Sequence, residues 1–278
     1  MNLIAIDIGN TTISTGLYLD DQEKFVRSIP GRADDARKQL TDLLVEAWGR
    51  IPVIEGSVEK KRNGVIVISS VQDIWLDMVT EICRESLGEK IRLIGRDIPL
   101  PIEMAMDNPA AVGTDRVVNA AAAFAVIEDA CVVASIGTAI TIDLIDEDGV
   151  FLGGVIAPGI EMGADALHAG TARLPRVKVQ TPKDPVGVNT VDAINAGLIY
   201  SAAGLLRMVT EKFAEQIGKW PHTIVTGGAA YYLKGSCDFV DSWISDLAVR
   251  GIVIAFKKHL DDLDKIEEMD PKNTSGNS

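Results

Sequence analysis

The fold of this chain is decided by residues 3–12, which read Leu-Ile-Ala-Ile-Asp-Ile-Gly-Asn-Thr-Thr. A short apolar run ends in Asp7, turn residues follow at once, and residues 13–19 again have the pattern of extended chain, so the stretch predicts a β-hairpin. Such a hairpin can hold the phosphates of a nucleotide, because Gly9 lets backbone approach closely and Asp7 can hold Mg²⁺ through water. The same residues also fit an ordinary hairpin, and they do not form a Walker loop, which needs a Gly-Lys-Ser/Thr ending in a helix.

Strands and helices alternate around this hairpin. Three short strands in an antiparallel meander are expected at residues 4–8, 13–19 and 24–29. The later strands, which are apolar runs, are expected at Gly64–Ser70 and Ile91–Ile94. The helices, which carry apolar residues at helical spacing, are expected at Ala33–Trp48, Trp75–Leu87 and Asp115–Ile127. A meander followed by alternating helices and strands indicates an α/β domain.

The second half of the chain begins in the same manner as the first. Residues 132–139, Val-Val-Ala-Ser-Ile-Gly-Thr-Ala, repeat the order of residues 4–11: apolar strand, small polar residue, Ile-Gly, hydroxyl, strand. Strands are then expected at Ile140–Ile145 and Val150–Ile156. We interpret the match as a duplication that yields two related domains, each with a phosphate-facing hairpin, and a cleft between them. Two unrelated strand-turn-strand units can also look alike.

The remainder of the second half is mostly helical. Helices are expected at Gly159–Ala169 and Asp192–Ile217, separated by a Pro-rich loop at Leu174–Val188. A strand at Thr223–Thr226 leads into Gly227-Gly228-Ala229-Ala230, which is interpreted as a glycine turn that opens into a helix and contacts an anion. Residues 266–278 are polar and aperiodic, and we expect a disordered tail there.

Composition excludes several classes of protein. The 278 residues carry a net charge of −13, so nucleic acid is not expected as a partner. Three widely spaced cysteines, Cys83, Cys131 and Cys237, indicate a reducing compartment rather than a disulfide framework. The first residues lack the basic segment of a signal peptide, and no apolar run is long enough to predict a membrane span. A cytoplasmic protein is therefore expected.

Four blocks, taken in order, resemble the type III pantothenate kinases. They are residues 7–11, Asp-Ile-Gly-Asn-Thr; residues 108–116, Asn-Pro-Ala-Ala-Val-Gly-Thr-Asp-Arg; residues 136–139 with 153–159 and 171–175; and residues 226–229, Thr-Gly-Gly-Ala. The resemblance implies two duplicated ribonuclease-H-like domains of the actin-like ATPase type with a central cleft. The expected ranges are 1–117 for the N-terminal domain and 118–265 for the C-terminal domain.

The resemblance also implies a reaction, in which ATP with Mg²⁺ phosphorylates the terminal hydroxyl of pantothenate in the first step of coenzyme A synthesis. A homodimer is implied as well. The residues implied to bind ATP are Asp7, Ile8, Gly9, Asn10, Thr11, Thr12, Ile13, Ser14 and Thr138. Those implied to bind the substrate are Gly113, Thr114, Asp115, Arg116 and Thr190. Asp115 would be the general base, and Asp7 would lie near the metal.

Elementary chemistry gives Asp115 two compatible roles. Phosphoryl transfer needs alignment, a metal ion and a base close to the attacking hydroxyl. Asp115 lies at an expected helix start, where a carboxylate accepts backbone N–H groups and becomes fixed in direction. The residue can therefore cap the helix, act as the base, or do both. Arg116 can pair with a carboxylate or phosphate through two hydrogen bonds, or form a surface salt bridge.

Two positions depart from the family pattern. The family commonly has an acid, associated with a monovalent cation such as K⁺ or NH₄⁺, where this chain has Ser135. A neutral hydroxyl is a weaker cation ligand, so K⁺ dependence is not expected here. Met106 stands where the family tends to have an aromatic residue against the substrate. These departures keep open two other functions: a non-catalytic nucleotide- or ligand-binding regulator, or a kinase for another small hydroxylated substrate.

Overall fold

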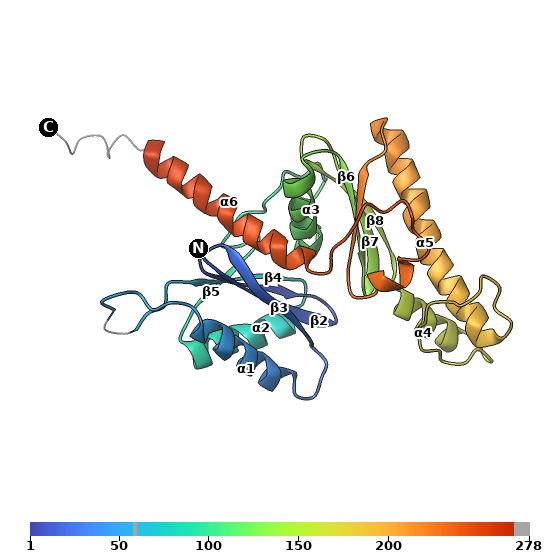
Figure 1. Ribbon diagram of the computed structural model, residues 1–278, viewed down its shortest axis with the longest axis horizontal. Coiled ribbons are helices and arrows are strands. Elements are labelled where there is room, and N and C mark those ends of the chain that lie inside the picture. The colour runs from blue at the N-terminus through green and yellow to red at the C-terminus, as the bar shows by residue number, and fades with distance from the viewer. Residues whose placement is uncertain (58–59, 270–278) are drawn as a thin grey trace. The chain divides into compact units, whose positions relative to one another are not determined.

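The computed structural model describes residues 1–57 and 60–269 of the chain. It divides into two compact units, each of which is built on one five-stranded sheet (Figure 1). The first unit comprises residues 1–101, 110–122 and the C-terminal segment from Ala248, and the second comprises 102–109 and 123–247. The units are thus discontinuous in sequence, in contrast to the contiguous ranges 1–117 and 118–265. The reason is that the C-terminal helix packs on the first sheet.

The first sheet has the strand order β3-β2-β1-β4-β5. Its strands are β1 (Leu3–Ile8), β2 (Thr12–Leu19), β3 (Gln22–Pro30), β4 (Val65–Ser70) and β5 (Ile91–Leu93). β1, β2 and β3 pair antiparallel, whereas β4 pairs parallel with both β1 and β5. The meander and both later strands expected from the sequence are confirmed.

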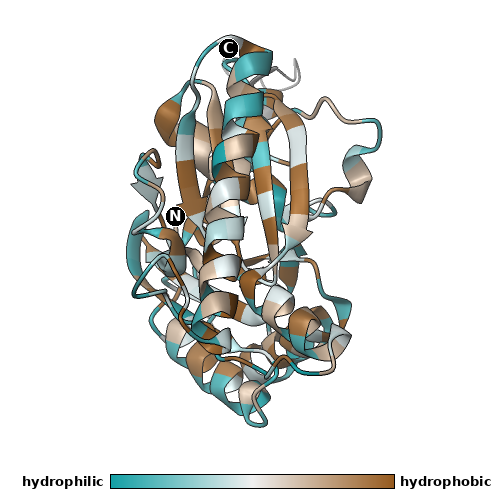
Figure 2. Ribbon diagram, turned by 90° about the vertical axis from the view of Figure 1, so that its right-hand side faces the viewer, coloured by the Kyte–Doolittle hydropathy of each residue, from teal (hydrophilic) through white to brown (hydrophobic). Residues whose placement is uncertain are grey.

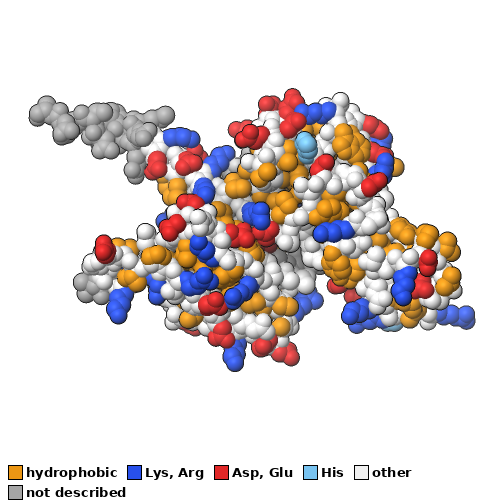
Figure 3. Space-filling model, in the orientation of Figure 1, with side chains coloured by type: hydrophobic (Ala, Val, Ile, Leu, Met, Phe, Trp, Pro, Cys, Tyr) orange, Lys and Arg blue, Asp and Glu red, His pale blue; other side chains and the backbone are white. Residues whose placement is uncertain are grey.

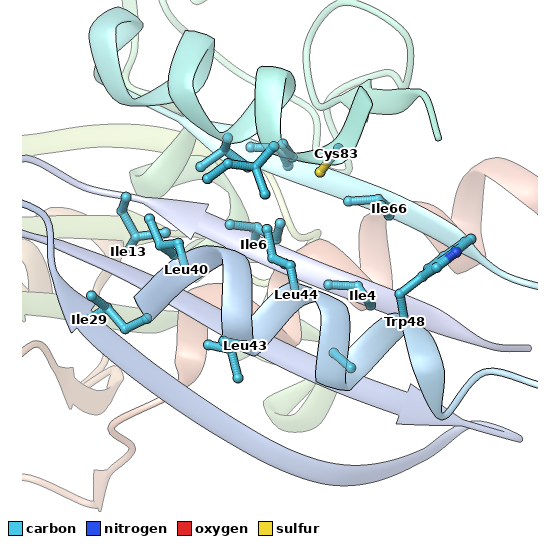
Figure 4. Close-up of a cluster of buried hydrophobic side chains, with 14 of the residues drawn as sticks. Ile4, Ile6, Ile13, Ile29, Leu40, Leu43, Leu44, Trp48, Ile66 and Cys83 are labelled. Carbon is cyan, nitrogen blue, oxygen red and sulfur yellow. The ribbon is translucent and has the colours of Figure 1, made fainter. Parts of the chain in front are cut away.

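Helices cover both faces of the first sheet. α1 (Ala36–Gly49) and α2 (Asp73–Ile82) bury their apolar stripes against the alternate β1 residues Ile4, Ile6 and Ile8 (Figure 4). The other face, which includes Leu3 and Ala5, packs against α3 (Thr114–Ile127) and α6 (Leu247–Met269). Period-two alternation along β1 therefore separates two cores, and Asp7 belongs to the face that meets α3 and α6.

The second sheet repeats this arrangement in the order β10-β9-β6-β7-β8. Its strands are β6 (Cys131–Ile136), β7 (Ala139–Ile145), β8 (Phe151–Pro158), β9 (His222–Thr226) and β10 (Ser242–Trp243). Read from β8, three antiparallel strands precede two parallel ones, as in the first sheet. α4 (Ile160–Gly170) and α5 (Thr190–Ile217) pack on one face of this sheet. The shared topology confirms the duplicated α/β fold.

Hydropathy follows the layers of each unit. Figure 2 shows brown, hydrophobic residues concentrated in the strands, and Figure 3 shows charged side chains spread over the visible surface. Among the described residues, α5 is the one helix whose length and composition would suffice to cross a membrane. Half of its most apolar window is buried within the protein, as in the core helix of a globular unit.

Four details differ from the sequence-based expectations. The helix expected to end at Leu87 is α-helical only to Ile82. Its last residues form a π-helical segment, η1 (Cys83–Leu87). The segment after Gly227-Gly228 forms only the four-residue 3₁₀ helix η3 (Ala230–Leu233), so it offers no α-helical N-terminus to an anion. Residues 266–269 continue α6 instead of beginning a tail, and residues 270–278 lie outside the described chain. The expectations did not include β10 or α6.

Candidate active site

Asp7 lies at the carboxyl end of β1, the usual position of ligand-binding groups in parallel sheets. In register it pairs with Ser14 of β2 and Ser69 of β4, so two hydroxyl residues flank the acid. Burial, reinforced by the charge of Asp115, raises the pKa of Asp7 from 3.8 to about 7. Its Oδ1 is buried and has no hydrogen-bond partner within residues 1–57 and 60–269. A buried orphan oxygen of this kind is suited to a cation or a bound donor.

The turn after Asp7 is held by its own backbone. Gly9 N donates to Thr12 O at 3.0 Å, and Gly31 N donates to Thr11 O at 2.9 Å. A Cβ on Gly9 would lie 3.4 Å from its nearest neighbour, Thr12 O, which is ordinary van der Waals contact, so a methyl group would fit there. Asn10, Thr11 and Thr12 are exposed, whereas Ile8 and Ile13 are buried in the core. The two isoleucines can therefore contribute only backbone to a ligand.

The N-terminus of α3 is bound to the end of β4 beside Asp7. Thr114 Oγ1 donates to Ser70 O at 3.1 Å, and Ser69 Oγ donates to Thr114 Oγ1 at 3.0 Å. Ser69 is fully buried, so this hydroxyl chain is an internal fastening. Since Ser69 is also the register partner of Asp7, the fastening places Asp115, the next residue of α3, in the electrostatic neighbourhood of Asp7.

The carboxylate of Asp115 is fixed and partly desolvated. Its Oδ1 accepts from Arg116 N at 2.9 Å. Burial raises the pKa of Asp115, while backbone N–H groups and the Arg116 charge oppose this rise. A Cβ on Gly113 would lie 2.6 Å from Asp115 Oδ1, so glycine at 113 leaves room for the carboxylate. The helix-start position is confirmed, and an oriented carboxylate with a raised pKa has the properties of a general base.

The second unit has its own turn at the equivalent place. Ser135 pairs in register with Thr141 of β7 and with Thr226 of β9. Gly137 N donates to Ala139 O at 3.0 Å, and Thr138 is exposed at the tip of the turn. Gly159 N donates to Thr138 O at 3.1 Å, and a Cβ on Gly159 would collide with the backbone of this turn. Gly227, with φ +99°, packs equally closely on Ile136.

Thr190 and Met106, which the sequence also links to the substrate, lie on other segments of the chain. Thr190 is the first residue of α5, directly after Asn189, whose Oδ1 caps the helix by accepting from Asp192 N at 3.0 Å. Thr190 lines a groove of about 1020 Å³ between α4 and α5, which is mostly apolar and includes Leu167 and Leu198. Met106 lies against Gly153 of β8, its Sδ 2.8 Å from where a Cβ would be. Leu174–Val188 is irregular, as expected.

The predicted site residues thus form two groups within separate units. The first unit brings Asp7, the 8–14 turn and Gly113–Arg116 together, and the second holds Ser135, Thr138 and Thr190. Sequence reasoning missed four hydroxyls: Ser69, Ser70, Thr141 and Thr226. Their signal was faint, because a Ser or Thr near the end of a strand is not by itself a functional motif. In the described part of the chain no three His, Cys, Asp or Glu side chains gather as a ready metal site.

Two such halves, each a five-stranded sheet with a glycine turn after its first strand, define the duplicated α/β fold of actin-like ATPases. The solved structure of a conserved putative Baf family transcriptional activator from Campylobacter jejuni shares this fold, with 19% identity and a TM-score of 0.57 over 93% of this chain and 99% of that one. (R)-2-hydroxyglutaryl-CoA dehydratase component A of Acidaminococcus fermentans aligns with 13% identity and a TM-score of 0.50, over 92% and 95%.

The sequence assigns the family. A model of the type III pantothenate kinase family matches residues 3–212. The type III pantothenate kinase of Syntrophotalea carbinolica is 33% identical over 260 residues, covering 92% of this chain and 99% of the relative. That of Halalkalibacterium halodurans is 30% identical over 262 residues, covering 93% and 100%. The chain belongs to the type III pantothenate kinase family.

Proposed function

We propose that this protein transfers the terminal phosphoryl group of ATP to the terminal hydroxyl of pantothenate, the first step of coenzyme A synthesis. The observation that carries the proposal is the pair Asp7 and Asp115, held together at the end of β1 and the start of α3 in a chain of this family. Phosphoryl transfer needs a cation near the phosphates and a base near the attacking oxygen, and the pair supplies one carboxylate for each task.

On the nucleotide side, Asp7 would hold Mg²⁺ through water, and residues 8–14, the turn with its flanking strand ends, would surround the phosphates with backbone and hydroxyl groups. The orphan Oδ1 and raised pKa of Asp7 fit a nearby cation, whose bound water would supply the missing partner. Bound there, Mg²⁺ would neutralise phosphate charge. Because no three-ligand cluster exists among the described residues, phosphate oxygens and water would complete its coordination. Thr138 of the second unit is proposed as a further phosphate contact.

On the acceptor side, Asp115 removes the proton of the attacking hydroxyl as the new oxygen–phosphorus bond forms. Its raised pKa brings it closer to neutral pH, where a base is most effective. Gly113 and Thr114 set its position through the fastening to β4. Arg116 and Thr190 are proposed as substrate contacts, and Met106 would supply apolar packing.

Three further proposals follow from family membership and composition. Ser135 replaces a charged cation ligand with a hydroxyl, so K⁺ or NH₄⁺ is not required. The protein acts in the cytoplasm as a homodimer, which the exposed small and apolar residues of α5, such as Gly197, Tyr200 and Gly204, support. A net charge of −13 disfavours binding to nucleic acid.

The decisive test is Asp115→Asn in a coupled assay for ADP release with pantothenate. Asparagine keeps an oxygen that can accept from Arg116 N but cannot take a proton, so turnover should fall by about 10²–10⁴-fold while both substrates still bind. Asp73→Asn is the matched control, because Asp73 is an exposed acid in the first turn of α2. Near-native turnover of Asp115→Asn would refute the assigned base, and a wild-type protein inactive with pantothenate would refute the function.

A further inference from the structure

Asn119 lies in the middle of α3, and its buried side-chain amide has no partner among the described residues. It is the sole polar residue in the stretch Val117–Ile127, and its side chain is 6% exposed. Its Oδ1 is buried and accepts no hydrogen bond from the described residues. Burying a polar group without a partner destabilises a protein, and an apolar side chain at this position would avoid that penalty. An orphan of this kind calls for a ligand that completes it.

The two other buried asparagines, Asn2 and Asn195, both have hydrogen-bond partners. Asn2 donates from Nδ2 to Asn63 O at 2.9 Å and accepts at Oδ1 from Asp20 N at 3.0 Å. Asn195 of α5 likewise accepts from Gln180 N at 2.9 Å and donates to Val191 O at 3.2 Å. Both of these amides hold a loop or strand end in place, whereas Asn119 makes no such bond within the described part of the chain.

Helix geometry connects Asn119 to the proposed base. Residues four apart lie one above the other on the same face of a helix, and side chains tilt toward the helix N-terminus. Asn119 is four residues after Asp115, so it leans toward the turn that carries the carboxylate. The adjacent Val118 meets the first sheet and α6 instead: it belongs to their shared core, and Gly251 of α6 closely approaches its carbonyl oxygen. The amide is therefore placed on the acid face of α3.

We propose that Asn119 is a substrate-orienting residue, whose side-chain amide binds a polar group of the acceptor next to its reacting hydroxyl. The inference rests on the proposed function and extends it by one contact. Pantothenate has a second hydroxyl and an amide close to the reacting alcohol, and either can donate a hydrogen bond to Oδ1. Holding that group one helical turn beyond Asp115 aims the alcohol at the base. The unpaired amide of the free protein is thereby satisfied in the complex.

Asn119→Leu, which has nearly the same shape and no polar atoms, tests this contact against Asn2→Leu. Thermal midpoint, KM for each substrate and kcat are measured for both variants and for the wild type. Asn119→Leu should retain or raise the midpoint, because no intramolecular hydrogen bond is lost, and should raise KM for pantothenate about tenfold with KM for ATP unchanged. Asn2→Leu should lower the midpoint by several degrees and leave both KM values unchanged. Asn119→Ala serves as a smaller second variant that cannot overpack the helix.

The outcomes separate the contact from the function. A wild type without pantothenate-dependent ADP release refutes the proposed function itself. If the wild type is active, unchanged KM for pantothenate in both Asn119 variants overturns the substrate contact. An equal rise in KM for ATP also overturns it, because the amide would then serve the nucleotide. A fall in midpoint in both variants, matching that of Asn2→Leu, would show that Asn119 holds the fold and would overturn the orphan assignment.

Discussion

The ends of β1 and β6 are equivalent positions in the two units, yet their chemistry differs. The residue before the last of β1 is Asp7, which pairs in register with Ser14 and Ser69. The same position of β6 holds Ser135, which pairs with Thr141 and Thr226. The neighbours are hydroxyl residues in both sheets, so the central residue is the difference. The first site is charged and carries a second acid on α3; the second is neutral.

The two units therefore share the backbone of the turn but differ in the side chains beside it. A backbone turn with a glycine is retained in both units, with Gly9 N and Gly137 N each donating to a carbonyl oxygen across the turn at 3.0 Å. Such turns can present N–H groups to phosphate wherever they occur. The two carboxylates, Asp7 and Asp115, both belong to the first unit, and carboxylates can bind a cation or accept a proton. The duplicated scaffold therefore carries an acid at one turn and a neutral hydroxyl at the other.

Removing the two central residues in turn should produce the largest effect. Asp7→Ala removes the one carboxylate from the set Asp7, Ser14 and Ser69. We expect kcat/KM to fall by roughly 10²–10³-fold and the response to Mg²⁺ concentration to change. Ser135→Ala removes one neutral donor and should cost about tenfold or less. Initial rates titrated with Mg²⁺ for both variants test the contrast. Equal losses, or a Mg²⁺ response of Asp7→Ala that matches wild type, would contradict it.

Placing an acid at position 135, as at position 7, should show how the neutral side chain of Ser135 affects turnover. Wild-type turnover should change less than about twofold when Na⁺ is replaced by K⁺, because a lone hydroxyl binds monovalent cations weakly. Ser135→Asp introduces a carboxylate beside the proposed phosphate site, which should lower activity about tenfold in Na⁺ through charge repulsion. K⁺ should recover part of that loss. Strong K⁺ activation of the wild type would show that the second site is not neutral in function.

The sequence predicts the two hairpins well, because each hairpin depends on a local pattern. Apolar runs, Gly9 and Gly137, and the spacing of Asp7 and Ser135 identify both hairpins, and the strand assignments are confirmed by the sheet register. The neighbours across the sheet could not be predicted in the same way. Ser69 and Thr226 reach their positions through parallel pairing with distant segments, and the chain shows no local signal for that register.

Helix α3 illustrates the same limit for the site. Asp115 at a helix start could be predicted from the residues around it, whereas its electrostatic coupling to Asp7 requires the fastening of Thr114 to the end of β4. The packing of α6 on the first sheet is similarly non-local. The apolar residues of α6, among them Val249 and Ile252, pack with residues far earlier in the chain, including Leu3 and Ala5.

Adding a methyl group to each turn should have a smaller effect that is similar in the two sites. A Cβ on Gly9 or Gly137 would lie 3.4 Å or 3.8 Å from its nearest neighbour, so both alanine variants should fold with unchanged thermal midpoints. Each methyl would nevertheless occupy space where phosphate approaches, and KM for ATP should rise about tenfold. Gly159→Ala is the contrasting control, because its Cβ would collide with backbone and should destabilise the protein. Unchanged KM in both turn variants would place the phosphates elsewhere.

The smallest expected effect is on the stability of the free protein. The pKa of Asp7 rises from 3.8 in the unfolded chain to about 7, so the folded state binds a proton between these values that the unfolded state lacks. The free energy of unfolding should therefore fall as pH rises from about 4 to 7. Asp7→Asn removes this dependence, and it should stabilise the protein without ligands by about 1–3 kcal/mol at pH 8 and by much less at pH 5.

Urea unfolding of wild type and Asp7→Asn at pH 5 and pH 8, without nucleotide or Mg²⁺, measures this difference directly. The stability of Ser135→Ala relative to wild type should be the same at both pH values, because a hydroxyl does not titrate in this range. If the stability of Asp7→Asn relative to wild type were the same at both pH values, burial would not disfavour the charged form of Asp7. The acid site would then cost the fold no more than the neutral one, and the asymmetry between the two units would lie in catalysis alone.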